Sequence, residues 1–156
     1  MTPPALANFD TGETAIVHAS CVALSGRALL IVGASGSGKS ALALDLMALG
    51  AGLISDDRVA LRRMVSSVIA TAAPEIGGLI EARGLGLLHV SAQAPTPLAW
   101  VLDLDRQEPQ RLPPHREIRL LGHSVPLLFR PPLPHLAPSL AQLLKAGRAA
   151  PDGTDR

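Results

Sequence analysis

Apolar residues along the chain fall into short runs separated by glycine, proline and charged residues. Residues 15–24 and 28–32 are rich in strand-forming side chains, and the Ser25-Gly26-Arg27 segment between them predicts a hairpin turn. Residues 39–49 are strong helix formers, and Gly50 can close that helix in the left-handed conformation. Because this helix is apolar on nearly every side, we expect it to be largely buried.

The rest of the chain predicts more strands and a second helix. Further strands are expected at 53–55, 59–64, 67–72, 85–90, 98–105, 117–122 and 125–129, and the last two of these are expected to pair. The proline-rich segments at 113–114 and 130–138 are expected to be connectors, because proline cannot donate a hydrogen bond to a sheet. Residues 138–145 predict a short terminal helix.

These elements do not alternate regularly between strand and helix, so a doubly wound parallel sheet is not expected. The sequence predicts an α/β fold in which a strand-rich, mixed sheet surrounds one early helix. We divide the chain into a lead of residues 1–14, a single domain of residues 15–147 and a frayed tail of residues 148–156. A chain of 156 residues leaves no room for a second catalytic domain.

Composition excludes several functional classes. The formal net charge is +1, and no block of Lys and Arg alternates with aromatic residues, so nucleic acid is not an expected partner. The single cysteine, Cys21, has no second cysteine for a disulfide or metal cluster, and we interpret it as a small buried strand residue. The N-terminus does not resemble a signal peptide, and the longest apolar run is too short to span a bilayer. We expect a soluble, cytoplasmic protein that does not bind membranes.

The stretch GASGSGKS matches the phosphate-binding pattern G-x-x-x-x-G-K-[ST] in full, and the context is right, with an apolar strand before it and a helix after it. The glycines let backbone N–H groups converge on phosphate oxygens, Lys39 can reach the β- and γ-phosphates, and the Ser40 hydroxyl can ligate Mg²⁺. The loop therefore predicts a P-loop site for a nucleoside triphosphate and a metal. Its residues are Gly33, Ala34, Ser35, Gly36, Ser37, Gly38, Lys39 and Ser40.

Phosphoryl transfer also needs an acidic group to hold the metal, and often one to accept the proton of the attacking hydroxyl. Asp103 closes an apolar run, as the metal-binding carboxylate of ordinary P-loop proteins does, whereas Asp56 and Asp57 follow a short apolar strand just after the helix. Adjacent carboxylates on an extended chain point to different sides, so one could face the metal and the other the nucleophile. Spacing alone leaves both places open.

Weaker candidates lie outside the loop. Glu81 and Arg83 are two apart with glycines following, and on an extended segment they would share a face, with the acid near metal and the guanidinium near phosphate. A salt-bridged surface turn explains this segment at least as well. His18 is isolated on its predicted strand, and such a histidine is usually structural. The other histidines show no metal-ligand spacing.

In this order, His18, the loop GASGSGKS, the segment LISDDRV and the segment EARGLGLLHV together resemble the catalytic domain of the bacterial HPr kinase/phosphorylase family. The resemblance covers about residues 15–91 and, more loosely, the strands to about residue 130. It implies the strand-rich P-loop fold that this family shares with phosphoenolpyruvate carboxykinases. It also implies the family's reaction, in which the γ-phosphate of ATP passes to a serine of the phosphocarrier protein HPr.

The resemblance further implies a role for each matching residue. Asp56 would be the acid/base that takes the proton from the target serine, with His18 as its neighbour. Asp57, Ser40 and Glu81 would handle Mg²⁺. A base for serine is most effective when burial or a neighbouring carboxylate raises its pKa, and Asp57 is such a neighbour.

Lys39 and the loop amides would hold ATP, and Arg83 would support the transferred group. The implied partners are HPr, nucleotide and inorganic phosphate, which would reverse the reaction, and the implied assembly is the family's hexamer. The family's long form has an N-terminal domain and a longer C-terminal helical region, so this chain is expected to correspond to the shortened form of some proteobacteria. Arg130 is the best match for the basic residue of that C-terminal region. A small-molecule kinase and a non-catalytic nucleotide sensor remain the rival classes.

Overall fold

A computed structural model of the chain describes residues 2–75 and 77–150. After a short 3-10 turn at Pro4–Leu6, the first half contains β1 (Thr14–His18), β2 (Ser20–Leu24), β3 (Arg27–Val32), α1 (Lys39–Ala48), β4 (Gly52–Ser55), β5 (Arg58–Arg63) and β6 (Val68–Ala72). The second half contains β7 (Leu79–Ala82), β8 (Gly86–His89), β9 (Thr96–Gln107), β10 (Glu117–Leu120), β11 (His123–Arg130) and α2 (Leu136–Ala146). No helix among the described residues is long and apolar enough to cross a membrane.

Within the described residues, nine strands form one mixed sheet and β7 and β8 form a separate two-stranded hairpin. The main path runs β1-β5-β6-β9-β3-β2-β4, and β10 joins it through β11. β9 pairs in parallel with β3 and with β11, whereas the other pairings are antiparallel. The expected strand-rich, mixed sheet is therefore confirmed.

Strand β9 is the element that joins the parts of this sheet. Its first residues pair with β6, as in Ala70 opposite Thr96, its middle pairs with β3, and its later part pairs with β11. The predicted strand at 98–105 was too short at both ends, because the added residues gain hydrogen bonds from partners distant in sequence. One strand thus holds three others in place.

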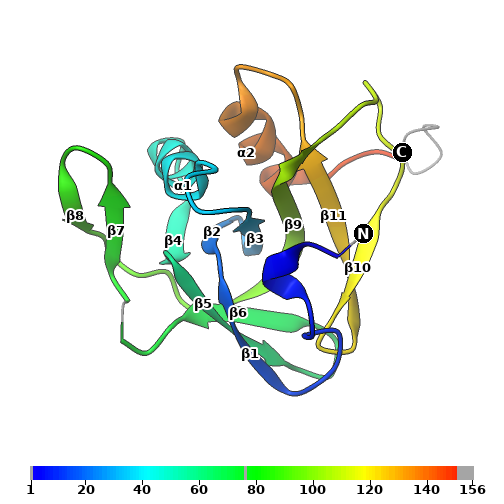
Figure 1. The fold of residues 1–156 in the computed structure, drawn as a ribbon, viewed down its shortest axis with the longest axis horizontal. Coiled ribbons are helices and arrows are strands. Elements are labelled where there is room, and N and C mark those ends of the chain that lie inside the picture. Colours follow the sequence, from blue (N-terminus) through cyan, green and yellow to red (C-terminus); the bar gives the residue numbers. More distant parts are fainter. Residues whose placement is uncertain (1, 76, 151–156) are drawn as a thin grey trace.

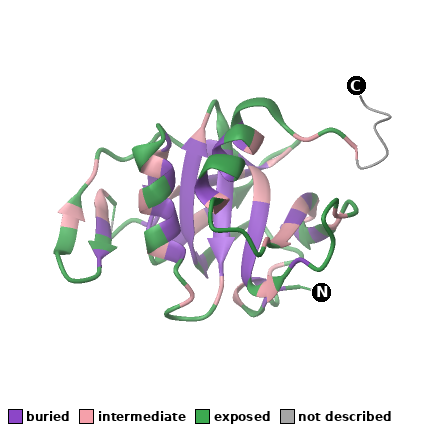
Figure 2. Cartoon of the chain, turned by 90° about the horizontal axis from the view of Figure 1, so that it is seen from above, coloured by how far each residue is buried: buried purple, intermediate pink, exposed green. Residues whose placement is uncertain are grey.

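The two helices lie on the same face of the sheet (Figure 1), and the sheet has an apolar core on each face. Leu29 and Ile31 of β3 pack in the core shared with the helices, whereas Leu30 and Val32 pack in the core on the opposite face. Side chains alternate between the faces of a strand, so a continuously apolar strand is what two cores require. Figure 2 shows these central strands buried along most of their length.

The single strand predicted over residues 15–24 is in fact two strands. The Ala19 N–H donates to the Asp57 carbonyl at 3.1 Å, between β1 and β2. On one side of this point β1 pairs with β5, and on the other β2 pairs with β3 and β4. The apolar pattern continues through Ala19, so it did not predict that the neighbouring strands change at this residue. The predicted hairpin between β2 and β3 is confirmed, and Cys21 is buried on β2 as expected.

Helix α1 ends as its sequence predicts. Gly50 has a φ of +107°, its N–H donates to the Met47 carbonyl, and the Ala51 N–H donates to the Leu46 carbonyl. These two bonds form a Schellman motif, which satisfies the last carbonyls of a helix. The expectation that this helix is buried on nearly every side is wrong, because Ala41 and other residues of its outer face are exposed.

The C-terminal predictions hold in part. The connector predicted at residues 130–138 is shorter than expected, because Arg130 ends β11 and α2 begins at Leu136. β10 and β11 pair antiparallel, and the terminal helix is present as α2, which begins two residues before the expected start. Pro138 lies in the first turn of α2, where no helical hydrogen bond needs its missing N–H. In the predicted N-terminal lead, Leu6 is fully buried in the core. Of the tail predicted at 148–156, residues 151–156 lie outside the described residues.

Candidate active site

The loop of residues 33–40 connects β3 to α1 and depends on its glycines. Gly36 and Gly38 have φ values of +83° and +102°, which other residues rarely adopt. A Cβ atom at Gly33 would lie 2.6 Å from the Ser37 hydroxyl oxygen, so any larger residue there would displace the loop. The backbone can therefore curl tightly in front of the start of α1, where several N–H groups are left without helical partners.

The Lys39 side chain bends back over this loop. Its ammonium group donates to the Gly33 carbonyl at 2.9 Å and to the Ala34 carbonyl at 3.2 Å, and the residue is only 8% exposed. Among the described residues no carboxylate forms an ion pair with it. The Ser37 hydroxyl oxygen is likewise buried without a hydrogen-bond partner in the described part of the chain. A buried cation that lacks a counter-charge favours an anionic ligand, and the loop thus fits phosphate.

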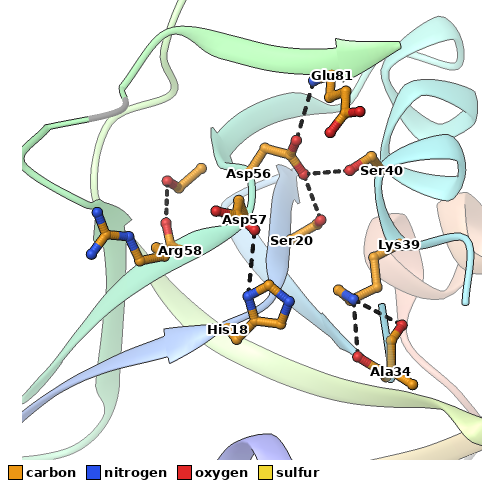
Figure 3. A network of polar contacts seen from close by, with 11 residues as sticks. His18, Ser20, Ala34, Lys39, Ser40, Asp56, Asp57, Arg58 and Glu81 are labelled. Carbon is orange, nitrogen blue, oxygen red and sulfur yellow. Dashed lines mark hydrogen bonds and ion pairs between the residues drawn. The ribbon is translucent and has the colours of Figure 1, made fainter. Parts of the chain in front are cut away.

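Asp56 is the centre of a network of hydrogen bonds between distant elements (Figure 3). Its Oδ1 accepts hydrogen bonds from the hydroxyls of Ser20 at 2.7 Å and Ser40 at 2.8 Å, and its Oδ2 accepts one from the Glu81 N–H at 3.3 Å. The residue is buried at the end of β4. The network joins β2, α1 and β7 at one carboxylate, next to the loop serine that was expected to ligate a metal.

Ser20 is the member of this network that sequence reasoning missed. It is fully buried at the start of β2, and its hydroxyl is directed at Asp56. A hydroxyl inside an otherwise apolar run, close to His18, was the one signal that could have identified it.

Asp57 lies on the other side of the chain from Asp56. It adopts a left-handed conformation, with φ of +67°, and its carboxylate is exposed. The His18 ring, expected beside Asp56, instead lies against Asp57, with 3.4 Å between His18 Nδ1 and Asp57 Oδ1. The prediction that the two adjacent carboxylates point to different sides is confirmed, because the left-handed turn at Asp57 directs one inward and the other toward solvent (Figure 3).

Glu81 and Arg83 were expected to share one face of an extended segment. They lie instead on the β7–β8 hairpin and do not share a face. β7 ends at Ala82, and the Leu85 N–H donates to the Ala82 carbonyl, which closes a turn that contains Arg83. Glu81 reaches Asp56 through its backbone N–H, and its side chain is exposed. Arg83 is exposed and forms no hydrogen bond or ion pair with any described residue.

Asp103, the alternative acid, is buried on β9 opposite Val32, one strand away from the loop. Its neighbours Leu102 and Leu104 pack with the helices, so its own side chain points to the opposite face of the sheet. There Oδ1 accepts a hydrogen bond from the Asp105 N–H at 2.9 Å, and Oδ2 lies 3.4 Å from Arg106 Nε. Of the two candidate acids, Asp56 contacts Ser40, whereas Asp103 contacts its own strand.

Two further residues hold the loop from the sides. Asp105 Oδ2 accepts a hydrogen bond from the Ala34 N–H at 2.8 Å. Arg130, at the end of β11, donates to the Ser37 carbonyl at 3.3 Å. Arg130 is therefore a neighbour of the loop, although the two are 93 residues apart in the sequence.

The donor set around Ser40 suits Mg²⁺ better than a metal that needs a cage of protein ligands. In the described part of the chain no group of three or more His, Cys, Asp or Glu residues is arranged to hold a metal ion. Mg²⁺ usually keeps several waters and is held by one or two protein groups together with substrate phosphates. The Ser40 hydroxyl and the adjacent Asp56 carboxylate are such groups.

The loop, the buried Lys39 and the Ser40–Asp56 pair, placed between a parallel strand and a helix, define a P-loop domain. The family comparison makes this assignment specific. Residues 10–94 match the model of the HPr serine kinase C-terminal domain, and the chain belongs to that family. The matched segment includes the loop and every residue bonded to Asp56, and it excludes Asp103 and Arg130.

Individual relatives agree with the family model. The HPr kinase/phosphorylase of Aromatoleum aromaticum is 36% identical over 133 residues, which cover 76% of this chain and 42% of that protein. The HPr kinase/phosphorylase of Caldicellulosiruptor bescii is 35% identical over 145 residues, which cover 83% of this chain and 47% of that protein. The chain thus spans less than half the length of these two relatives.

A solved structure confirms the fold. The HPr(Ser) kinase/phosphatase from Coxiella burnetii superposes with a TM-score of 0.72, over 84% of this chain and 88% of that chain, at 22% sequence identity. The strand-rich P-loop architecture predicted from the sequence is therefore the one present.

Proposed function

We propose that this chain is an ATP- and Mg²⁺-dependent kinase that phosphorylates a serine of the phosphocarrier protein HPr in the cytoplasm and so regulates the phosphotransferase system. The observation that carries the proposal is the contact between Asp56 Oδ1 and the Ser40 hydroxyl, 2.8 Å long. This contact supports the proposal that the Asp56 carboxylate lies where the loop would present the γ-phosphate. The names of the relatives supply HPr as the acceptor.

In the proposed reaction the loop amides and Lys39 bind the phosphates. The oxygen of the target serine attacks the γ-phosphorus, and the bond from that phosphorus to the bridging oxygen breaks, so that ADP leaves with the bonding electrons. Asp56 accepts the serine proton. Its Oδ2 is suited to this step because its one hydrogen bond, from the Glu81 N–H, is long at 3.3 Å.

Mg²⁺ held at Ser40 would neutralise charge that develops on the phosphates. Glu81 donates its N–H to Asp56 and has an exposed carboxylate, which would accept hydrogen bonds from the waters of this ion. The Asp57 carboxylate faces His18 on the other side of the chain, so the expected role of Asp57 at the metal has no support from a contact with Ser40. Arg83 would reach the transferred phosphate from the hairpin turn. In phosphorolysis, an oxygen of inorganic phosphate would attack the phosphorus of phosphoserine, and the bond from that phosphorus to the serine oxygen would break. Pyrophosphate would form, and protonated Asp56 would give its proton to the leaving serine oxygen.

Transfer of label from [γ-³²P]ATP to purified HPr tests the proposal. Wild-type protein should label a serine, Asp56→Asn should abolish labelling while keeping ATP binding by calorimetry, and Asp103→Asn should keep labelling. Normal labelling by Asp56→Asn together with loss of labelling in Asp103→Asn would overturn the assignment. ATP binding without any labelling of HPr would identify a nucleotide sensor, and transfer to a small molecule instead of HPr would identify a small-molecule kinase.

A further inference from the structure

Strand β9 bulges where it passes the phosphate loop. Phe129 of β11 lies opposite Asp103, but the next residue, Arg130, lies opposite Gln107. Residues 104–106 of β9 therefore leave the pairing with β11. Bulges redirect side chains and are common beside active sites. None of the roles proposed above uses this bulge.

The bulge is anchored at both of its ends. At its start, Asp103 Oδ1 accepts a hydrogen bond from the Asp105 N–H at 2.9 Å, and Asp103 Oδ2 lies 3.4 Å from Arg106 Nε. Asp103 is only 1% exposed, so its carboxylate is held among these groups and not by water. At the other end, the Glu108 N–H donates to the Arg130 carbonyl at 2.8 Å. The shape of the bulge is therefore fixed by a buried acid and a backbone hydrogen bond.

The bulge lies against the first two residues of the loop. A Cβ atom at Gly33 would lie 3.2 Å from the Leu104 Cβ, so the two segments are already in close contact. Beside this contact, Asp105 Oδ2 accepts the Ala34 N–H at 2.8 Å. The bulge thus brings a carboxylate to a loop whose expected ligand is an anion.

One peptide group connects Asp105 with the ammonium group of Lys39. Its N–H, at Ala34, donates to Asp105, and its carbonyl, at Gly33, accepts a hydrogen bond from Lys39 Nζ at 2.9 Å. Donation to a carboxylate polarises the peptide, so its carbonyl becomes a better acceptor for the ammonium group. An ammonium group has three N–H donors. Lys39 uses a second donor on the Ala34 carbonyl, so the direction of the third, which is left for phosphate, is fixed.

We propose that Asp105, held by the bulge, is a positioning residue that acts through the peptide between Gly33 and Ala34 to aim Lys39 at the triphosphate; this inference rests on the proposed function, which assigns a triphosphate to the loop. Asp105 has the same sign of charge as phosphate, so repulsion alone would weaken ATP binding. If charge alone mattered, removal of Asp105 would strengthen binding. Because Asp105 positions Lys39, its removal weakens binding instead, and the two explanations differ in sign.

Isothermal titration with ATP and Mg²⁺ measures this sign. ATP affinity should fall about tenfold in Asp105→Ala. It should stay within about threefold of wild type in Asp105→Asn, because the amide oxygen can still accept the Ala34 N–H. Asp10→Ala removes the same charge from an exposed position in the N-terminal lead and should leave ATP affinity unchanged. Because Asp105 is exposed, its variants should unfold at the wild-type temperature.

The same substitution in the Lys39→Ala protein tests whether Asp105 acts through Lys39. There, Asp105→Ala should change ATP affinity by less than about twofold, because the group that it positions is gone. Titration up to millimolar ATP covers the weaker binding expected of Lys39→Ala.

Four results would overturn the inference: unchanged or tighter ATP binding in Asp105→Ala, an equal loss of affinity in Asp105→Asn, a tenfold loss that persists without Lys39, or a lower unfolding temperature as the sole effect. Failure of the proposed function looks different. ATP binding would then show the expected differences among the variants, while the wild type would label no HPr.

Discussion

The loop with its Asp56 network and the β7–β8 hairpin are built in opposite ways. In the first region, Lys39 and Asp56 are buried and each makes several hydrogen bonds to elements of the main sheet or the loop. In the second, Arg83 has no partner among the described residues, and Leu85 is 80% exposed. Figure 1 shows the hairpin extending beyond α1, away from the sheet.

The difference separates two requirements of a transfer reaction. Phosphate and acid must be held in a fixed geometry, which packed strands and a helix provide. Groups that meet a second protein need access and tolerate motion, which a small hairpin with few buried contacts provides. Within the part of the chain that the structure describes, one hydrogen bond joins the two regions, from the Glu81 N–H to Asp56. A partner that displaces the hairpin would therefore also act on the position of the acid.

The largest effect is expected at the rigid region. Lys39→Ala should lower the rate of HPr labelling by about 10²- to 10³-fold, because the phosphates lose a fixed positive charge. Thermal stability should change little, since the ammonium bonds only loop carbonyls. Lys145→Ala, an exposed lysine at the end of α2, is the matched control and should label normally. Retention of more than a tenth of the wild-type rate in Lys39→Ala would contradict the assignment.

Arg83→Ala tests the comparison further, because it should lower the activity and leave the stability unchanged. The labelling rate should fall by about 10²-fold if Arg83 supports the transferred phosphate. The free energy of unfolding in urea should stay within about 0.5 kcal/mol of wild type, because the side chain has no partner among the described residues. Arg111→Ala, another exposed arginine, should change neither quantity. A fall in stability together with activity would mean that the hairpin is structural.

Ser20→Ala should combine both effects at a smaller size. Asp56 would lose its shortest hydrogen bond, so stability should fall by about 1 kcal/mol and the labelling rate by about tenfold. Circular dichroism during urea unfolding and the labelling assay give the two values. Ser66→Ala removes an exposed hydroxyl between β5 and β6 and should leave both unchanged. An unaltered rate in Ser20→Ala would show that the remaining bonds position Asp56 sufficiently.

A largely buried ion pair joins Glu108, just after β9, to Arg116, just before β10, and we expect it to contribute to stability but not to function. Arg116 hydrogen-bonds the Glu108 carboxylate and holds its pKa below the usual range. Glu108 therefore stays ionised in the native state at a pH where it begins to protonate in the unfolded chain. Its contribution is complete above the unfolded pKa of about 4.3 and is lost as the pH falls through the lower native pKa.

Glu108→Gln should accordingly destabilise the protein at neutral pH and weaken the loss of stability in acid. Urea unfolding at a series of pH values from neutral to acid measures this change, and ATP binding at pH 7 should remain normal. An unchanged slope of stability against pH in Glu108→Gln would show that other carboxylates dominate acid unfolding.

The sequence predicted the features that depend on neighbouring residues and missed those that depend on residues far away in the chain. The loop, α1 and the Gly50 cap depend on neighbouring residues, and all three agree with prediction. The break at Ala19 and the three partners of β9 depend on strands that pair across long separations, which an apolar run cannot report.

The candidate site divides in the same way. The sequence placed Asp56 and Asp103 at comparable strand ends, and only the alternation of faces along β9 and the Ser40 contact distinguish them. Ser20 was missed because its partner lies 36 residues away. Arg83 was expected on an extended segment, but β7 ends one residue earlier and Arg83 lies in the turn that follows. Chemistry could be anticipated from motifs, whereas the orientation of each group required the packed sheet.

The hydrogen bond between the Ala34 N–H and Asp105 has a consequence for when the nucleotide site forms during protein synthesis. The two residues are 71 apart, and β3 cannot pair with β9 until that later segment has left the ribosome. The phosphate loop therefore emerges long before the strand and carboxylate that steady it. A nascent chain that ends before residue 96 should not retain nucleotide, and the ability to bind it should arise late in synthesis, when β9 enters the sheet.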